Sequence, residues 1–191
     1  MLTVRPAHEV PWEDVEAVFG TRGGPSGCWC QRYTYTDGWI WHGAPEMHRE
    51  SLQDQVSSGD PMGLIAYLDD EPVGWCAVRP RAAYAKLLKL PVPWKGRSED
   101  KTDSDVWAVT CFVVRPGFRK QGVSRALVEA AVAFARDNGA EALEAYPMLT
   151  TPGKDITWGE LHVGARSAFA AAGMQQVSHP YPRRVVMRID F

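Results

Sequence analysis

A basic turn that contains a glycine is the stretch of this chain with the clearest chemistry. Residues 119–124 read Arg-Lys-Gln-Gly-Val-Ser, between an apolar run at 106–114 and an alanine-rich stretch at 125–136. The run predicts a strand buried on both faces, and apolar residues spaced by three and four after the turn predict a helix. A helix N-terminus has backbone N–H groups without partners and the positive end of the helix dipole. With two cations beside it, the turn is predicted to bind an anion.

The same residues resemble the signature of a known enzyme family. Arg119-x-x-Gly122-x-Ser124 after an apolar strand resembles the Arg/Gln-x-x-Gly-x-Gly/Ala motif of the GNAT family of N-acetyltransferases, with a small serine at the last position. In that family the turn holds the pyrophosphate of acetyl-CoA, and the preceding strand pairs with the pantetheine arm as with an added strand. An ordinary strand–turn–helix with a solvated basic turn is the alternative. The resemblance implies that acetyl-CoA is the co-substrate. Its binding residues would be Phe112, Val113, Val114, Arg119, Lys120, Gln121, Gly122, Val123 and Ser124.

The order of the other expected elements agrees with this resemblance from residue 2 to the C-terminus. It implies an α/β fold of one GNAT-like domain over residues 1–191, with a central mixed sheet flanked by helices. The weakest correspondences are 21–58, which begins with a loop at 21–27, and a long insert at 79–105 with a short helix at 82–90. Strands are expected at 2–5, 63–68, 73–78, 106–114, 140–146, 174–177 and 184–189, a turn at 179–182, and helices at 11–19, 46–57, 125–136 and from 161 or 164 to 172.

Composition and charge exclude several classes of protein. The 191 residues carry a formal net charge of −2, and 45% of them are hydrophobic, as in globular proteins. A balanced charge gives no long-range attraction to nucleic acid, and no apolar run approaches the roughly 18 residues of a membrane-spanning helix. The first residues lack the basic and apolar segments of a signal peptide. We therefore expect a cytoplasmic protein with no nucleic-acid or membrane partner, and the sequence leaves a homodimer open.

Cysteine spacing does not favour a metal or redox site. Cys28 and Cys30 are separated by one residue, which is closer than the usual Cys-x-x-Cys spacing. Zinc would need two more ligands, and only His42 and His48 lie near in the sequence. The other two cysteines lie within apolar strand patterns. We therefore expect no metal site and reduced thiols.

The residues that usually complete the chemistry of this family are not at their usual places. Attack of an amine on a thioester needs a group that removes the proton of the amine and one that protonates the departing thiolate. The family often has a tyrosine in the late helix, four residues before its closing glycine. Counting back from Gly173 gives Phe169, which has no proton to donate. Relatives often have a carboxylate on the signature strand, but residues 107–110 contain none.

Glu144 and Tyr146 are the best substitutes and are predicted to be catalytic. They lie on one face of the strand expected at 140–146, because side chains two positions apart in a strand point the same way. A carboxylate in a buried strand is unusual. An ion-paired Glu144 and a Tyr146 packed under a loop are equally open alternatives. His162 is a less favoured candidate in a more exposed pattern, and a base that acts through water is also open.

Trp29, Tyr33, Trp39 and Trp41 form an aromatic segment that is predicted to bind the acceptor substrate. Aromatic rings can enclose a cationic amine or stack on a flat apolar ligand. Packing of the first helices on the sheet explains these rings equally well, because several of the eight tryptophans must lie in the core.

Together these features predict an acetyl-CoA-dependent N-acetyltransferase in which a primary amine attacks the thioester directly. A small-molecule amine is favoured over a protein lysine or N-terminus, because the insert at 79–105 and the aromatic segment can enclose a pocket. The alternative is a non-catalytic, regulatory acyl-CoA-binding module with the same fold, which Phe169 and the missing strand carboxylate would explain.

Overall fold

Seven strands form one mixed sheet at the centre of the part of the chain that the structure describes. The computed structural model describes residues 1–20, 22–35, 44–151, 153 and 156–191. The strand order is β1-β2-β3-β4-β5-β7-β6, and of the neighbouring pairs only β4 and β5 run parallel. This confirms the expected α/β fold with a central mixed sheet. The strands are β1 (Leu2–Pro6), β2 (Leu64–Leu68), β3 (Glu71–Pro80), β4 (Val106–Val114), β5 (Ala142–Ala145), β6 (Gln175–Tyr181) and β7 (Arg184–Asp190).

An extra residue in the middle of β4 changes the course of this strand. The β3–β4 register shifts by one residue between Ala77 and Val78, which leaves Thr110 of β4 without an opposite residue. An extra residue of this kind bends a strand and increases its twist. The pairing of β4 with β5 ends at the same place, since its last pair joins Val109 to Ala145. Beyond this point β4 continues with one edge uncovered by β5.

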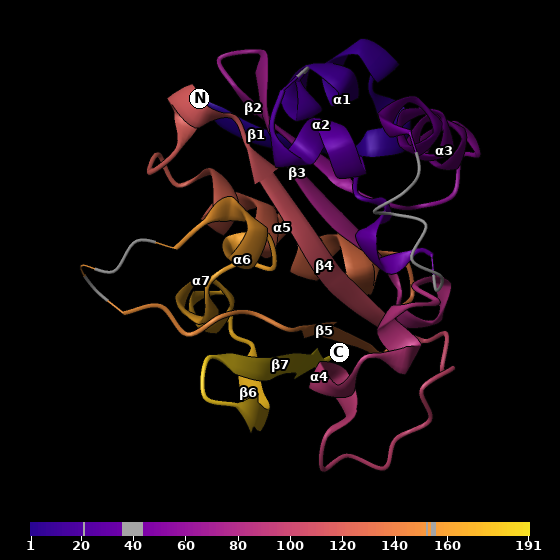
Figure 1. Ribbon diagram of the computed structural model, residues 1–191, viewed down its shortest axis with the longest axis vertical. Helices are drawn as coiled ribbons and strands as arrows, with labels where there is room; N and C mark the ends of the chain where they lie inside the picture. Colours follow the sequence, from indigo (N-terminus) through magenta and orange to yellow (C-terminus); the bar gives the residue numbers. More distant parts are fainter. Residues whose placement is uncertain (21, 36–43, 152, 154–155) are drawn as a thin grey trace.

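Helices cover both faces of the sheet. The apolar side of α5 packs on strands β1 to β5 with α7 beside it, and α1 and α3 lie in the core of the opposite face. Figure 1 shows α1, α2 and α3 gathered around one end of the sheet, with the β6–β7 hairpin at the other end. None of the described helices is long and apolar enough to cross a membrane. The helices are α1 (Trp12–Phe19), α2 (Gly24–Cys28), α3 (Pro45–Ser57), α4 (Pro91–Trp94), α5 (Val123–Asp137), α6 (Trp158–Leu161) and α7 (Arg166–Ala171).

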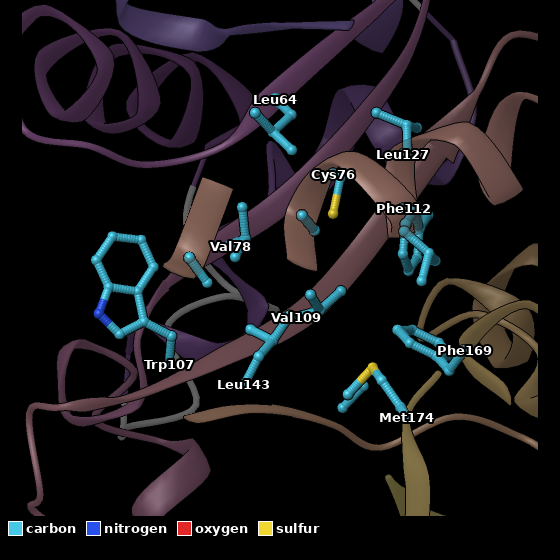
Figure 2. Close-up of a cluster of buried hydrophobic side chains, with 14 of the residues drawn as sticks. Leu64, Cys76, Val78, Trp107, Val109, Phe112, Leu127, Leu143, Phe169 and Met174 are labelled. Atoms are coloured by element: carbon cyan, nitrogen blue, oxygen red, sulfur yellow. The ribbon is translucent and has the colours of Figure 1, made fainter. Parts of the chain in front are cut away.

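The core on the α5 face fixes the start of α5 against the end of β4. Leu127 of α5 and Phe169 of α7 are fully buried in it, and Phe169 meets Phe112 of β4 edge to face with ring centroids 5.9 Å apart. Figure 2 shows these side chains together with Leu143 of β5 and Met174, the residue before β6. Burial of this apolar surface, at about 25 cal/mol per Å², is what holds α5 and α7 on the sheet.

Two segments before β4 differ from the sequence-based expectation. The loop expected at 21–27 contains part of α2, where Pro25 supplies the fixed φ of a first helical turn. The helix expected at 82–90 is wrong, because the chain forms two 3₁₀ turns there, η4 (Arg81–Ala83) and η5 (Leu87–Lys89). The proline that begins α4 keeps the residue before it extended, which stops a longer helix.

The C-terminal part also differs in its boundaries. The turn expected at 179–182 lies at 182–183, and β6 continues through Pro180. A proline is tolerated because β6 is an edge strand. The late helix is shorter than expected, since α7 begins at Arg166, and the short helix α6 precedes it.

We predict that Gly74 of β3 does not tolerate a side chain. A Cβ atom there would lie 2.6 Å from Val123 Cγ1 and 3.2 Å from Leu127 Cδ1, so α5 would have to move away from the sheet. Gly74→Ala should therefore lower the free energy of unfolding, measured in urea, by about 1–3 kcal/mol. Gly117→Ala is the matched control, because no atom lies within 4 Å of a Cβ at that position. Equal losses in the two variants would contradict this packing.

Candidate functional site

The basic turn places backbone N–H groups at the end of β4. After β4, the 3₁₀ turn η6 (Pro116–Phe118) leads to Gly122, which is the N-cap of the 15-residue helix α5. Gly122 has a φ of 82°, in the left-handed region that glycine adopts without strain. This conformation directs the first N–H groups of α5 out of the helix end, where Gly122 has no side chain to cap them.

A cleft of about 540 Å³ lies between this turn and the late helix. Its volume is within the range of about 300–1,000 Å³ that is common for small-molecule sites. The turn supplies its basic end, and β4, α5 and the segment from 156 to 168 supply its apolar walls. An anion-binding turn therefore continues into an apolar groove. The lining residues are Phe112, Val114, Phe118, Arg119, Lys120, Gly122, Val123, Ser124, Arg125, Val128, Ile156, Leu161, Gly164, Ala165 and Ala168.

Two of the residues predicted to bind the cofactor do not line this cleft. The backbone of Val113 lies opposite Trp75 of β3, and its side chain is buried in the core of the other face. The side-chain amide of Gln121 donates a hydrogen bond to the Gly117 carbonyl at 3.1 Å. Cofactor contacts of Val113 and Gln121 therefore stay predictions that the geometry does not favour.

The edge of β4 that faces the cleft already holds one hydrogen bond. Arg115, which follows β4, donates its N–H to the Val73 carbonyl of β3 at 3.0 Å, so its backbone groups face β3. Because successive residues of a strand direct their backbone groups to opposite edges, those of Phe112 and Val114 face away from β3, toward the cleft. The Phe112 N–H donates to the His162 carbonyl at 2.6 Å. A ligand that pairs with the backbone of Phe112 must therefore replace this bond.

Residues 162–166 fill the gap where β4 and β5 part. Besides the bond described above, the Met148 N–H donates to the Gly164 carbonyl at 3.0 Å, and the Arg166 N–H donates to the Met148 carbonyl at 2.9 Å. Gly164 has a φ of 82°, and a Cβ atom there would lie 2.8 Å from the Phe169 ring. Only glycine fits this close approach, which sets the inner end of the cleft.

Three arginines and a tyrosine hold the carboxylate of Glu144. Glu144 is fully buried, and its Oε1 accepts hydrogen bonds from Arg97 and, at 3.0 Å, from Arg188. Its Oε2 lies 3.1 Å from Arg81 Nη1 and accepts a hydrogen bond from the Tyr146 hydroxyl at 3.0 Å. Burial alone would raise the pKa of Glu144, but hydrogen bonds and positive charge from Arg97, with the charge of Arg81, lower it below its ordinary value.

This network ties the insert at 79–105 to the sheet. Arg81 and Arg97 belong to the insert, and the Arg81 guanidinium lies 4.8 Å from the ring centroid of Trp94. The expectation that Glu144 and Tyr146 share a face is confirmed by their hydrogen bond. Because both carboxylate oxygens are engaged, the geometry favours the ion-paired alternative. Catalytic roles for Glu144 and Tyr146 stay predictions.

The late helix offers only an apolar side chain where the family often has a proton donor. Phe169 lies in α7, and the chain leaves this helix just before Gly173, as the sequence count implies. The Phe169 ring is fully buried against Phe112 at the inner end of the cleft. Any proton that reaches a thiolate at this end must therefore come from another group.

The two described residues of the predicted aromatic segment, Trp29 and Tyr33, lie in different buried clusters. Trp29 is buried and stacks on Phe19 of α1 with ring centroids 5.0 Å apart, so packing explains its position. Trp39 and Trp41 lie outside the described residues. Tyr33 instead points toward the segment that precedes α7. Substrate contacts of these residues stay predictions.

A buried pair, Tyr33 and His162, was not predicted from the sequence. The Tyr33 hydroxyl lies 3.1 Å from His162 Nε2, across a separation of 129 residues. His162 is 5% exposed, so the more exposed position expected for it is wrong. Its Nδ1 lies 3.0 Å from the Gly159 carbonyl. Burial, and then the positive charges of Arg32 and Arg184, lower the pKa of His162 to about 4, so the imidazole is neutral at pH 7.

The cysteines lie apart from the cleft. All four are buried and unpaired, and the Trp75 indole N–H donates to Cys30 Sγ at 3.3 Å. Burial is the main cause that raises the pKa of the Cys28 thiol to about 11. Among the residues that the structure describes, no group of three or more His, Cys, Asp and Glu side chains could hold a metal ion.

Comparisons with known proteins point to one family. Residues 29–151 match the model of the acetyltransferase (GNAT) family. The chain is similar to a PaiA N-acetyltransferase from Thermoplasma acidophilum in complex with coenzyme A, at 13% identity and a TM-score of 0.54, covering 100% of this chain and 99% of that chain.

Two further solved structures have the same fold. The GNAT domain of S. lividans PAT is 18% identical with a TM-score of 0.56, covering 98% of this chain and 89% of that one. YncA, a putative acetyltransferase from Salmonella typhimurium with its cofactor acetyl-CoA, is 13% identical with a TM-score of 0.54, covering 99% and 93%. No curated protein matches the chain by sequence.

We predict that Glu144 is needed for stability. Glu144→Gln removes the charge that balances the buried Arg81, so we expect a loss of about 3–5 kcal/mol in the free energy of unfolding. Because the pKa of Glu144 is lowered in the folded state, its contribution is present above the unfolded pKa of about 4.3 and is lost as the pH falls through the folded value. When the pH is lowered below about 4, the free energy of unfolding of the variant should therefore fall less than that of the wild type.

Glu99→Gln is the control for this prediction. Glu99 contacts the same three arginines, but its side chain is 41% exposed, so its loss should be under about 1 kcal/mol. Equal effects of the two substitutions on urea unfolding would show that Glu144 is not the centre of the network.

Proposed function

Because the chain belongs to the GNAT family of acetyltransferases, we propose that it transfers an acetyl group from acetyl-CoA to the primary amine of a small molecule. The observation that carries this proposal is the cleft that joins the basic turn at Gly122 to the uncovered edge of β4. A pyrophosphate and an extended amide-containing arm need these two features side by side.

The turn has the groups that a pyrophosphate requires. The first N–H groups of α5 supply hydrogen-bond donors at the positive end of the helix dipole. Arg119, Lys120 and Arg125 line the same end of the cleft and supply positive charge. Further in, Val114 lines the cleft. Its carbonyl accepts a hydrogen bond from Arg119 Nε at 3.4 Å, and the pantetheine arm can pair with its backbone as an added strand would once it replaces this bond. Phe112 contributes its side chain to the apolar wall.

The reaction we propose forms one C–N bond and breaks one C–S bond. The neutral amine attacks the thioester carbon, the thiolate of CoA leaves, and one proton passes from nitrogen to sulfur. An alkyl amine with a pKa of about 10.4 pays roughly 4–5 kcal/mol to be neutral at pH 7. A buried site lowers this cost because it disfavours the ammonium form, and it also aligns the two reactants.

The insert supports a small acceptor over a protein. Tyr84, which follows η4, and Leu87 of η5 pack with Tyr33 and Tyr146 in one buried cluster over β4 and β5. The insert therefore closes the face of the sheet beside the end of the cleft. A peptide that presents a lysine or an N-terminus would need an open groove on that face.

Acetyl-CoA turnover tests this function. The purified chain is incubated with acetyl-CoA and, separately, with polyamines, amino acids, an aminoglycoside, a lysine peptide and a peptide with a free N-terminus, and release of the CoA thiol is measured. Turnover with a small amine supports the proposal. Turnover with peptides alone contradicts the acceptor class. Binding of acetyl-CoA without thiol release on any acceptor would favour the acyl-CoA-binding module.

A variant at Gly122 tests the cofactor site. We predict that Gly122→Trp abolishes binding of CoA in isothermal titration, because the indole fills the end of the cleft. Gly139→Trp is the control, since Gly139 has a similar φ of 83° but lies just after α5 ends, at the far end of the helix. Both variants carry the same kind of backbone strain, so strain alone cannot distinguish them. We therefore expect only Gly122→Trp to lose CoA binding. Unchanged CoA affinity in Gly122→Trp would exclude this cleft as the cofactor site.

A further inference from the structure

The proposed reaction moves a proton from nitrogen to sulfur, and the usual carriers are missing. β4 has no carboxylate at 107–110, and Phe169 of α7 cannot donate. Glu144 is engaged by three arginines, and the hydroxyl of Tyr146 donates to it. The group that accepts and returns the proton is therefore either another side chain near the inner end of the cleft or a water molecule.

Tyr33 and His162 lie at this end. His162 is placed by its own backbone, because its carbonyl accepts the Phe112 N–H at 2.6 Å. Its neighbours in the segment, Leu161 and Gly164, line the cleft. The Tyr33 and His162 rings stack with centroids 6.0 Å apart. Both side chains of the pair are buried and neither lines the cleft itself, so the pair lies beneath Phe112, the innermost residue of β4 that lines the cleft.

The hydrogen bonds of His162 fix which nitrogen carries the proton. The Gly159 carbonyl, 3.0 Å from Nδ1, can only accept, so Nδ1 is the protonated nitrogen of the neutral ring. Nε2 is then an acceptor, and the Tyr33 hydroxyl at 3.1 Å donates to it. The Tyr33 oxygen also accepts a hydrogen bond from the side chain of Arg184, and its remaining lone pair can accept one from an amine N–H.

We propose that Tyr33 and His162 form a proton shuttle between the acceptor amine and the departing thiolate. This rests on the proposed acetyl transfer. As the amine nitrogen bonds to the thioester carbon, its proton passes to Tyr33 Oη while the Tyr33 proton passes to His162 Nε2. As the C–S bond breaks, the proton returns from Nε2 through Tyr33 to the sulfur. One C–N bond forms, one C–S bond breaks, and the pair ends as it began.

The surroundings of the pair suit a transient carrier. Burial is the main cause that lowers the pKa of the imidazole, and the positive charges of Arg32 from the turn η2 (Gln31–Tyr33) and Arg184 from β7 lower it further. Burial also raises the pKa of Tyr33, so that its hydroxyl stays protonated at rest. An imidazolium formed in this setting is a stronger acid than an exposed one and gives its proton readily to a thiolate. Pairing of the pantetheine with Val114 leaves the bond between Phe112 and His162 intact.

Nitrogen NMR of the histidines tests the resting state of the pair in the whole protein. His162→Gln assigns the signal. We expect a neutral ring with the proton on Nδ1 at pH 7, and a titration midpoint near pH 4. A proton on Nε2, or an imidazolium at pH 7, would overturn the shuttle whatever the enzyme acetylates.

Steady-state kinetics test the function of the pair, with spermidine, glycine and hydroxylamine as probe acceptors. We expect Tyr33→Phe and His162→Gln each to lower kcat for a basic amine by about 10²–10⁴-fold, with the KM for acetyl-CoA unchanged. The double variant should lose no more than the worse single one, because the two residues act as a unit. The kcat for hydroxylamine, a weakly basic amine, should fall much less than the kcat for spermidine. A merely structural defect would instead lower the kcat for all acceptors equally.

Tyr181→Phe, at a 37% exposed position in β6, is the control and should keep wild-type kcat. Wild-type turnover in both Tyr33→Phe and His162→Gln would overturn the shuttle and leave the acetyl transfer standing. Equal losses with every acceptor, or a raised KM for acetyl-CoA, would also overturn it. A wild-type protein that binds acetyl-CoA but releases no thiol with any acceptor would overturn the proposed function and the shuttle with it.

Discussion

The parting of β4 from β5 is the constraint on which the rest of this structure depends. It begins where Thr110 bulges from β4 and the pairing with β5 ends at Val109. Backbone N–H and carbonyl groups inside a sheet need partners, so the gap has to be filled. Residues 162–166 fill its inner part through hydrogen bonds to Phe112 and Met148, and the outer part opens into the cleft. The same irregularity therefore makes room for a ligand and fixes the segment that carries His162.

The buried charges on the insert side serve a different purpose. Glu144 brings together Arg81 and Arg97 from the insert and Arg188 from β7, so that segments far apart in sequence meet at one carboxylate. Burial of an unpaired charge is costly, and each partner here is needed by the others. The insert is thereby fixed over β4 and β5, with Tyr84 packed beside Tyr33. This ion-pair network explains why a carboxylate lies in a buried strand.

The sequence predicts the features that depend on residues close together in the chain. β4, the turn with Gly122 and α5 follow one another along the chain, so their hydrophobic period and glycine were enough to place them. The sequence does not predict the features that depend on contacts between distant residues. The helix expected at 82–90 was overridden by prolines and by packing, and the neutral tautomer of His162 depends on contacts such as that with Tyr33, 129 residues away. The unusual position of Glu144 in a buried strand can be read from the sequence, but spacing along the chain does not identify its arginine partners.

The central claim is that the turn before α5 and the uncovered edge of β4 form one acetyl-CoA site. The most direct measurement is a crystal structure with CoA bound to the whole chain. The account predicts pyrophosphate oxygens within about 2.7–3.2 Å of the first backbone N–H groups of α5, and a pantetheine amide paired with Val114. It also predicts that the CoA sulfur lies next to Tyr33 Oη. CoA bound elsewhere, with the first N–H groups of α5 facing solvent, would contradict it.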